Sequence, residues 1–127
     1  FSLTGERTYY NRAEQTLRVF HQLMDQNAYG ASGLLCGLDL ALSKPKEVVI
    51  VGARGNPQTE SLLATLHQRY VPNKILLVID EARRGKEGEL PLAAGKVSVN
   101  GQPTAYVCQQ FTCSAPVTES AQLESLL

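Results

Sequence analysis

The fold of this chain is decided by the stretch from residue 47 to residue 52, which reads EVVIVG. An uninterrupted run of β-branched residues is typical of a strand that is buried on both faces of a sheet. Asn56 and Pro57 follow soon afterwards. This pair is a strong start signal for a helix, because Asn caps the first turn and Pro suits the first helical position. The stretch therefore predicts a buried strand, a tight turn and a helix.

A second apolar run from residue 74 to residue 80, KILLVID, predicts a second buried strand. Between the two strands, apolar side chains recur at helical spacing until Pro72 ends the pattern. A strand, a helix and a strand in this order form a right-handed βαβ unit with parallel strands. The run from residue 104 to residue 109, TAYVCQ, predicts a third buried strand. The inward stripe of the predicted helix consists of Thr59, Leu62, Leu63, Leu66 and Tyr70.

The first third of the chain carries apolar residues at steps of three and four, which predict a helix from Thr8, its N-cap, to Asp25. A second predicted helix spans residues 32–42 and is nearly apolar all round, so we expect it to be buried between layers. Cys36 lies on this helix and is expected in the core. Thr118 is predicted to cap a last short helix. The inward face of the first helix consists of Tyr10, Ala13, Leu17, Phe20 and Met24.

These elements define an α/β fold class. We expect two N-terminal helices plus a small parallel three-strand sheet in a three-layer α/β/α arrangement, with the first strand at its centre. Residues 1–44 are expected to form a helical hairpin, and residues 45–127 a small α/β domain that packs with it as one unit. Residues 81–96 are the least structured piece, because charges of both signs alternate there with glycine and proline.

The composition is ordinary for a soluble globular protein of 127 residues. Twelve basic and twelve acidic residues cancel to a formal charge of zero. That balance argues against nucleic acid as a partner and against an anionic membrane surface. No apolar run approaches the roughly 20 residues that span a bilayer. The chain starts at Phe1 without a methionine or a signal-like apolar core, so we expect a fragment of a longer chain.

The three cysteines are an odd number without dense spacing, which argues against a secreted disulfide scaffold. Free thiols in a cytoplasmic protein are the simpler interpretation, and one disulfide plus a free thiol is the alternative. Cys108 and Cys113 could form a redox pair only if residues 109–112 turn back, with Phe111 as an anchor. Only the start of the last helix could lower a thiol pKa. We expect Cys108 to be buried and the two thiols not to cycle.

The turn after the first strand is the candidate anion site. Gly52, Arg54, Gly55 and Asn56 join a strand to a helix start, where backbone N–H groups and a cation could hold a phosphate. The turn lacks both the G-x-G-x-x-G and the Walker pattern, so a plain tight turn is favoured. Asp80 ends the second strand at the same edge. It is a candidate general base, but without a partner nucleophile a turn or cap residue is the favoured interpretation.

His21 and His67 lie on different predicted helices and lack metal-ligand spacing to the cysteines, so no metal site is expected. The sequence indicates no cofactor.

Several spaced motifs resemble a known family. They are the stretch 47–52, the stretch 66–74 (LHQRYVPNK), and residues 105–108 (AYVC) followed by Cys113-x-x-Pro116-Val-Thr118. This order resembles the C-terminal region of the large thioredoxin-domain-containing proteins related to spermatogenesis-associated thioredoxin-like protein. The resemblance implies an upstream thioredoxin-like domain and a six-hairpin helical barrel similar to those of sugar epimerases and glycosidases. The redox motif of that family lies in the thioredoxin-like domain, so no catalytic residue is carried over to this chain.

The leading functional hypothesis is a non-catalytic C-terminal accessory module, whose partner is the remainder of its own parent chain. Residues 1–44 would complete the barrel, so the isolated fragment is expected to expose an apolar patch and to self-associate. A small anion- or ligand-binding module at the C-terminal edge of the sheet is the first alternative. A thiol redox module that uses Cys108 and Cys113 is the second. We expect no enzymatic activity of the fragment alone, no nucleic acid or membrane partner, and a cytoplasmic location.

Overall fold

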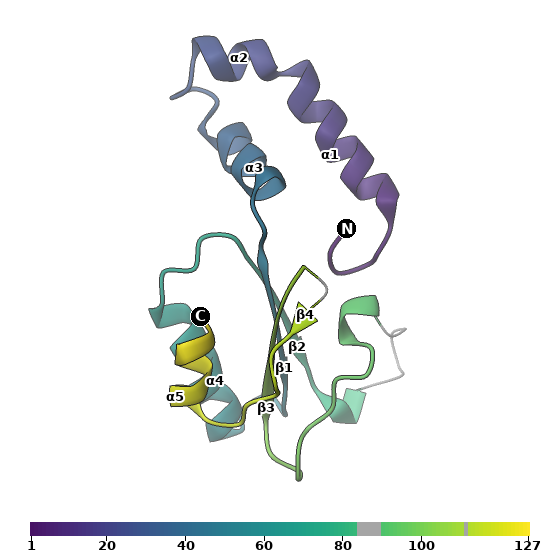
Figure 1. Cartoon of the computed structure of the whole chain (residues 1–127), viewed down its shortest axis with the longest axis vertical. Coiled ribbons are helices and arrows are strands. Elements are labelled where there is room, and N and C mark those ends of the chain that lie inside the picture. Colours follow the sequence, from purple (N-terminus) through teal and green to yellow (C-terminus); the bar gives the residue numbers. More distant parts are fainter. Residues whose placement is uncertain (84–89, 111) are drawn as a thin grey trace.

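The computed structural model describes residues 1–83, 90–110 and 112–127, without the side chain of residue 83. Within these residues the chain forms five α-helices, two 3-10 turns and four strands (Figure 1). The helices are α1 (Arg7–Val19), α2 (His21–Gln26), α3 (Ser32–Leu42), α4 (Pro57–Gln68) and α5 (Ser120–Leu126). The strands are β1 (Lys46–Val51), β2 (Lys74–Ile79), β3 (Thr104–Gln109) and β4 (Thr112–Cys113), and the 3-10 turns are η1 (Glu81–Arg83) and η2 (Pro91–Ala93).

The strands form one mixed sheet in the order β2-β1-β3-β4. β1 is parallel to β2 and occupies an internal position, as predicted. β3 is antiparallel to β1, with Val51 opposite Thr104, so the expectation of a purely parallel three-strand sheet is wrong. A parallel strand needs a crossover that returns the chain to the far end of the sheet. The described part of the β2–β3 connection contains no α-helix to make that return. β3 starts at the end of the sheet where β2 finishes, because Ile79 and Thr104 both lie beside Val51. Residues 84–89 of this connection, predicted to be loosely structured, lie outside the described residues.

Helix α4 begins as its sequence indicates. The Oδ1 atom of Asn56 accepts hydrogen bonds from the backbone N–H groups of Gln58 and Thr59, at 2.8 and 3.4 Å, and Pro57 occupies the first turn. Thr59, Leu62 and Leu66 of the predicted stripe are buried. Tyr70 is 92% exposed, so its assignment to the stripe is wrong. The helix ends at Gln68 and the backbone is extended at the next residue, which carries Tyr70 off the helical face.

Two apolar clusters cover the two faces of the sheet. On one face, Val48 and Ile50 pack with Leu62 and Leu66 of α4 and with Leu123 of α5. On the other face, the side chains come from β1, from η2 and from the N-terminal segment. No described α-helix covers that second face, so the expected three-layer α/β/α arrangement is wrong. A 3-10 turn and loop segments cover this face in place of a helical layer. The cluster there consists of Val49, Val51 and Leu92, with Leu3, Ile75, Leu77, Ile79 and Tyr106 against it.

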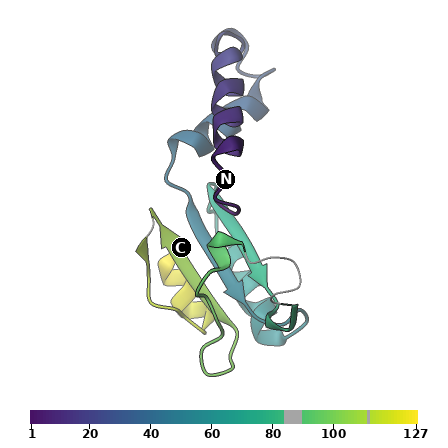
Figure 2. The ribbon, with the colours of Figure 1, turned by 90° about the vertical axis from the view of Figure 1, so that its right-hand side faces the viewer.

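The helices α1–α3 lie beyond one end of the sheet rather than on a face of it (Figures 1 and 2). The single helix expected up to Asp25 is interrupted at Phe20, whose backbone angles are not helical. Neither α1 nor α3 contains a buried residue, so the expectation that α3 is buried between layers is wrong. Cys36 is exposed rather than in the core, because nothing in the described structure covers that face of α3.

Two cationic side chains hold helix α5 against the rest of the fold. Lys46 donates from Nζ to the carbonyl oxygens of Leu126 and Leu127, at 2.7 and 2.6 Å. Arg69 forms an ion pair with Glu124 at 2.5 Å. The N-cap residue is Glu119 rather than Thr118, and it makes no side-chain cap bond. Cations at the end of a helix complement its dipole, so these contacts anchor α5 to β1 and α4.

In the part of the chain that the structure describes, no helix combines the length and the apolar character that crossing a membrane requires.

Candidate functional site

The β3–β4 hairpin carries a disulfide bond between Cys108 and Cys113. The two residues lie directly opposite each other in the antiparallel pair, and their Cα atoms are 3.9 Å apart. Free thiols were the simpler prediction, and the structure corrects it to the alternative of one disulfide plus a free Cys36. The physical reason is a reversal of the chain, since Gln110 has a φ of 50°, in the left-handed region. Phe111, the predicted anchor of that turn, lies outside the described residues.

The two sulfur-bearing residues differ in their exposure. Cys108 is 3% exposed, which confirms the prediction that it is buried in the sheet. Cys113 is exposed on the short edge strand β4. Glu47 of β1 lies opposite Cys108 in the register, and directly opposed residues of an antiparallel pair share a face of the sheet. The disulfide therefore has one accessible end, and a carboxylate on the adjacent strand shares its face.

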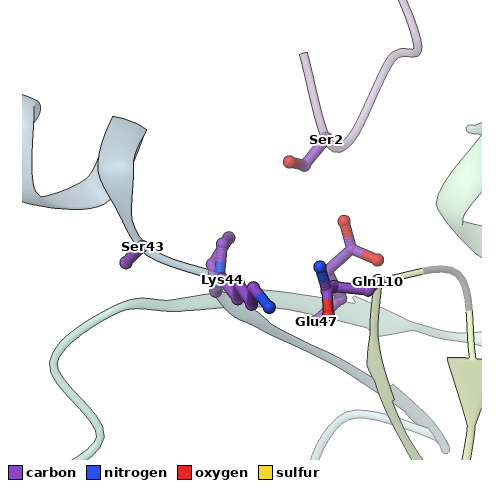
Figure 3. A pocket seen from close by; sticks show the side chains of 6 residues that line it. Ser2, Ser43, Lys44, Glu47 and Gln110 are labelled. Carbon is purple, nitrogen blue, oxygen red and sulfur yellow. The ribbon is translucent and has the colours of Figure 1, made fainter.

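A hollow lies next to this hairpin, where three segments far apart in the sequence meet (Figure 3). The α3–β1 linker forms one wall, the hairpin turn a second, and the N-terminal segment a third. The Nε2 atom of Gln109 donates a hydrogen bond to the carbonyl oxygen of Lys44 and so ties the hairpin to the linker. The hollow is lined by Ser2, Ser43, Lys44, Pro45, Glu47 and Gln110.

Sequence reasoning missed this hollow because no local motif marks it. Lys44 and Glu47 bring opposite charges to it, and Ser2 brings a hydroxyl group. Such a lining favours a small polar ligand or a polar peptide segment over an apolar one.

The turn after β1 brings together Gly52, Arg54, Gly55 and Asn56, as the sequence indicates. A Cβ atom at Gly52 would lie 2.3 Å from the Oγ1 atom of Thr59, so glycine permits the close approach of β1 and α4. The Asn56 side chain accepts hydrogen bonds from backbone N–H groups in the first turn of α4, those of Gln58 and Thr59. The Gly55 N–H donates to Oε1 of Glu60, at 3.3 Å. Arg54 is exposed. The N–H groups of Gly55, Gln58 and Thr59 are thus engaged by acceptors within the chain.

Asp80 lies at the same edge, because the Gly52 N–H donates to the carbonyl oxygen of Ile79, at 2.8 Å. Its Oδ1 atom accepts from the backbone N–H of Ala82, at 3.1 Å. This is the geometry of a residue that caps the turn after β2.

The two histidines are exposed and lie on α2 and α4. His21 contacts the carbonyl oxygen of Arg18 through Nδ1, at 2.9 Å. Nearby, the Glu14 carboxylate raises the pKa of Arg18, by a hydrogen bond first and by its charge second. Within residues 1–83, 90–110 and 112–127 there is no group of three or more His, Cys, Asp or Glu side chains that could hold a metal ion.

Fold and site together define a small α/β module with a helical extension and an edge disulfide. The chain is similar over nearly its whole length to spermatogenesis-associated protein 20. It is 28% identical to the Homo sapiens protein over 125 residues, 26% to the Rattus norvegicus protein over 126, and 27% to the Mus musculus protein over 127. No protein-family profile matches the chain, and no solved structure matches it.

The matches cover 98–99% of this chain but 16% of each relative. The chain therefore matches a segment of each of these much longer proteins and spans about a sixth of their length. The structure shows that this segment has a mixed α/β fold with its own core.

Proposed function

We propose that this chain is a non-catalytic accessory module of a larger thioredoxin-domain-containing polypeptide. In this proposal the helical hairpin formed by α1–α3 docks on the remainder of that polypeptide, namely the helical barrel and the thioredoxin-like domain. The observation that carries the proposal is that neither α1 nor α3 contains a buried residue, although α3 is largely apolar and α1 carries exposed Tyr9, Tyr10 and Val19. The relatives, of which the chain spans 16%, have ample further sequence to supply the partner surface.

Residues 1–44 expose more large apolar side chains than we expect of a helical hairpin that has no partner. Fully burying one large apolar side chain is worth roughly 1.5–3 kcal/mol, so leaving many of them in water forgoes most of that stabilisation. A contiguous apolar surface on a globular protein marks an interaction site. Within residues 1–44 the residues with large exposed apolar side chains are Phe1, Tyr9, Tyr10, Val19, Phe20, Leu23, Tyr29, Leu40 and Leu42, and Tyr29 is 97% exposed.

The hairpin is joined to the sheet by polar contacts at its base rather than by a shared core. The Nδ2 atom of Asn73 donates to Oδ2 of Asp39, at 2.7 Å, and Gln109 donates to the carbonyl oxygen of Lys44. Neither apolar cluster of the sheet includes a residue of α1, α2 or α3. This attachment leaves the exposed apolar side chains of α1 and α3 available to an apolar partner.

The test compares one substitution in two contexts. Val19→Lys replaces a side chain that is 68% exposed in the chain alone, so we expect no effect on the unfolding of the 127-residue chain. In the longer polypeptide the same substitution would place a charge in a docked interface, and we expect a loss of about 2 kcal/mol or more. Gln15→Lys, at an exposed polar position of α1, is the matched control and should be neutral in both. If Val19→Lys changes the free energy of unfolding equally in the 127-residue chain and in the longer polypeptide, the docking proposal is contradicted.

A second candidate function, a thiol redox module, gains support from the disulfide itself. A thiolate of a dithiol reductant would attack Sγ of the exposed Cys113, break the Sγ–Sγ bond and release Cys108 as a thiolate. The reductant's second thiolate would then attack its own mixed-disulfide sulfur and release Cys113. The reductant leaves as a disulfide, and two electrons have passed to the hairpin.

The redox candidate is tested by equilibrating the chain with reduced and oxidised glutathione and counting free thiols. A transition of Cys108 and Cys113 within the range of cellular glutathione potentials would support it. If the disulfide resists reduction throughout that range, it is a structural cross-link and the redox candidate is contradicted.

A further inference from the structure

Strand β2 ends the strand order of the described sheet, so one of its edges pairs with no described strand. In Figure 2 the teal strand β2 lies on the opposite side of β1 from the olive strands β3 and β4. Its interior is wholly apolar from Ile75 to Ile79, while Lys74 begins it and Asp80 follows it. Val78, the last residue but one of this strand, is 43% exposed. Long apolar edge strands are templates for pairing with another chain.

The register shows which backbone groups point away from β1. The Lys46 N–H donates to the carbonyl oxygen of Asn73, at 3.0 Å, and the Gly52 N–H donates to that of Ile79, at 2.8 Å. In a parallel pair only alternate residues of each strand bond to the neighbour. The odd-numbered residues of β2 therefore bond to β1, and Leu76 and Val78 direct their N–H and C=O groups outward.

We propose that β2 pairs with β2 of a second copy of this chain, antiparallel, about a two-fold axis that passes Leu77. In this register Leu76 of one copy lies opposite Val78 of the other. Both residues carry outward-facing backbone groups, so each pair exchanges two N–H···O bonds, as an antiparallel ladder requires. The two sheets become one continuous sheet across the axis.

The charges at the two ends of β2 favour a second copy of this chain as the partner of its free edge. The same register sets Lys74 of one copy opposite Asp80 of the other, and the two-fold axis repeats this pair at both ends of the interface. A self-complementary edge of this kind is what an isologous dimer needs. The proposal does not rest on the proposed accessory function, because it uses the edge of the sheet and leaves the α1–α3 surface free.

The test is sedimentation of the 127-residue chain, up to millimolar concentration, with charge reversals at the two ends of β2. Lys74→Glu and Asp80→Lys each turn both interface pairs repulsive, and each is expected to weaken the dimer about tenfold. The double variant restores two attractive pairs and should recover the wild-type dissociation constant. Circular dichroism verifies that each variant keeps its fold.

A backbone variant tests the edge itself. Val78→Pro removes an N–H group that points outward and takes no part in the β1 ladder, so we expect a folded monomer, because edge positions tolerate proline. Gln15→Lys, at an exposed polar position of α1, is the control and should leave the dimer unchanged. A chain that stays monomeric at every concentration would overturn the proposal. So would a dimer that Val19→Lys abolishes while the charge reversals leave it intact, since that dimer would use the helical face.

Discussion

Asn73, in the loop before β2, donates a hydrogen bond from Nδ2 to Oδ2 of Asp39 on α3, over 2.7 Å. This contact joins the α/β part to the helical hairpin across a part of the surface that contains no apolar cluster. The hairpin is thus positioned relative to the sheet mainly by polar contacts at its base. Its stability in the chain alone depends on few interactions, and its orientation depends on contacts such as this one.

Substituting Asn73 by alanine is therefore expected to loosen the hairpin more than it weakens the whole fold. A hydrogen bond to a charged group contributes about 1.5–3 kcal/mol when buried and less when exposed, so we expect about 1 kcal/mol or less in urea unfolding. Amide exchange in α3 should accelerate clearly, because α3 loses one of the polar contacts that tie the hairpin to the sheet. Unchanged exchange in α3 would show that this contact does not position the hairpin.

Thr59→Val is expected to stabilise the chain. The Thr59 side chain is 1% exposed, and its Oγ1 atom has no hydrogen-bond partner among the described residues. Leaving a buried hydroxyl unpaired costs about 1–3 kcal/mol, so the nearly isosteric valine should raise the free energy of unfolding by about 1 kcal/mol. Thr65→Val is the control, because Thr65 donates to the carbonyl oxygen of Ser61, at 3.0 Å. If both variants are destabilising, the Thr59 hydroxyl has an acceptor in solution.

Removing the Cys108–Cys113 disulfide is expected to cost about 2 kcal/mol of unfolding free energy, because it closes a short loop and restricts the unfolded chain only modestly. Cys113→Ser, measured by urea unfolding, gives this value. Cys36→Ser should be neutral, since Cys36 is free and exposed. A loss near zero for Cys113→Ser would indicate that the hairpin is held without the cross-link.

Phosphate is expected to leave the turn after β1 unaffected. The Gln58 N–H already donates a hydrogen bond to Asn56, and the Gly55 N–H already donates one to Glu60. The negative charge of the Glu60 carboxylate also repels an anion. Titrating phosphate to millimolar concentration should therefore leave the amide signals of Gly55, Asn56 and Thr59 in place. Selective shifts at these amides, with a rise in melting temperature, would instead support the anion-binding hypothesis.

The sequence was sufficient for those elements whose signals are local. The β-branched run of β1 and the Asn56–Pro57 start of α4 are set by neighbouring residues, and the structure has both as predicted. The direction of β3 was not predictable in this way. It depends on the path of the connection between residues 80 and 103, and no residue in β3 itself encodes whether it runs parallel or antiparallel to β1.

The errors at the candidate site have a related cause. The pairing of Cys108 with Cys113 required residues 109–112 to turn back, which no local motif predicts, and Gln110 has the left-handed backbone of such a turn. Cys36 was expected in the core because an all-round apolar helix is normally covered. In this chain that cover is missing from the described residues, which is the observation behind the docking proposal.

Hydrogen exchange of the α1 amides tests the central claim most directly. It is measured in the 127-residue chain and in the longer polypeptide that the proposal requires. In the chain alone, α1 has no buried residue, so its amides should exchange early, well before those of β1. In the longer polypeptide we predict that α1 gains protection close to that of β1, because its apolar face is covered. Equally fast exchange of α1 in both would contradict the account, since the exposed face of the hairpin would then have no partner in its own polypeptide.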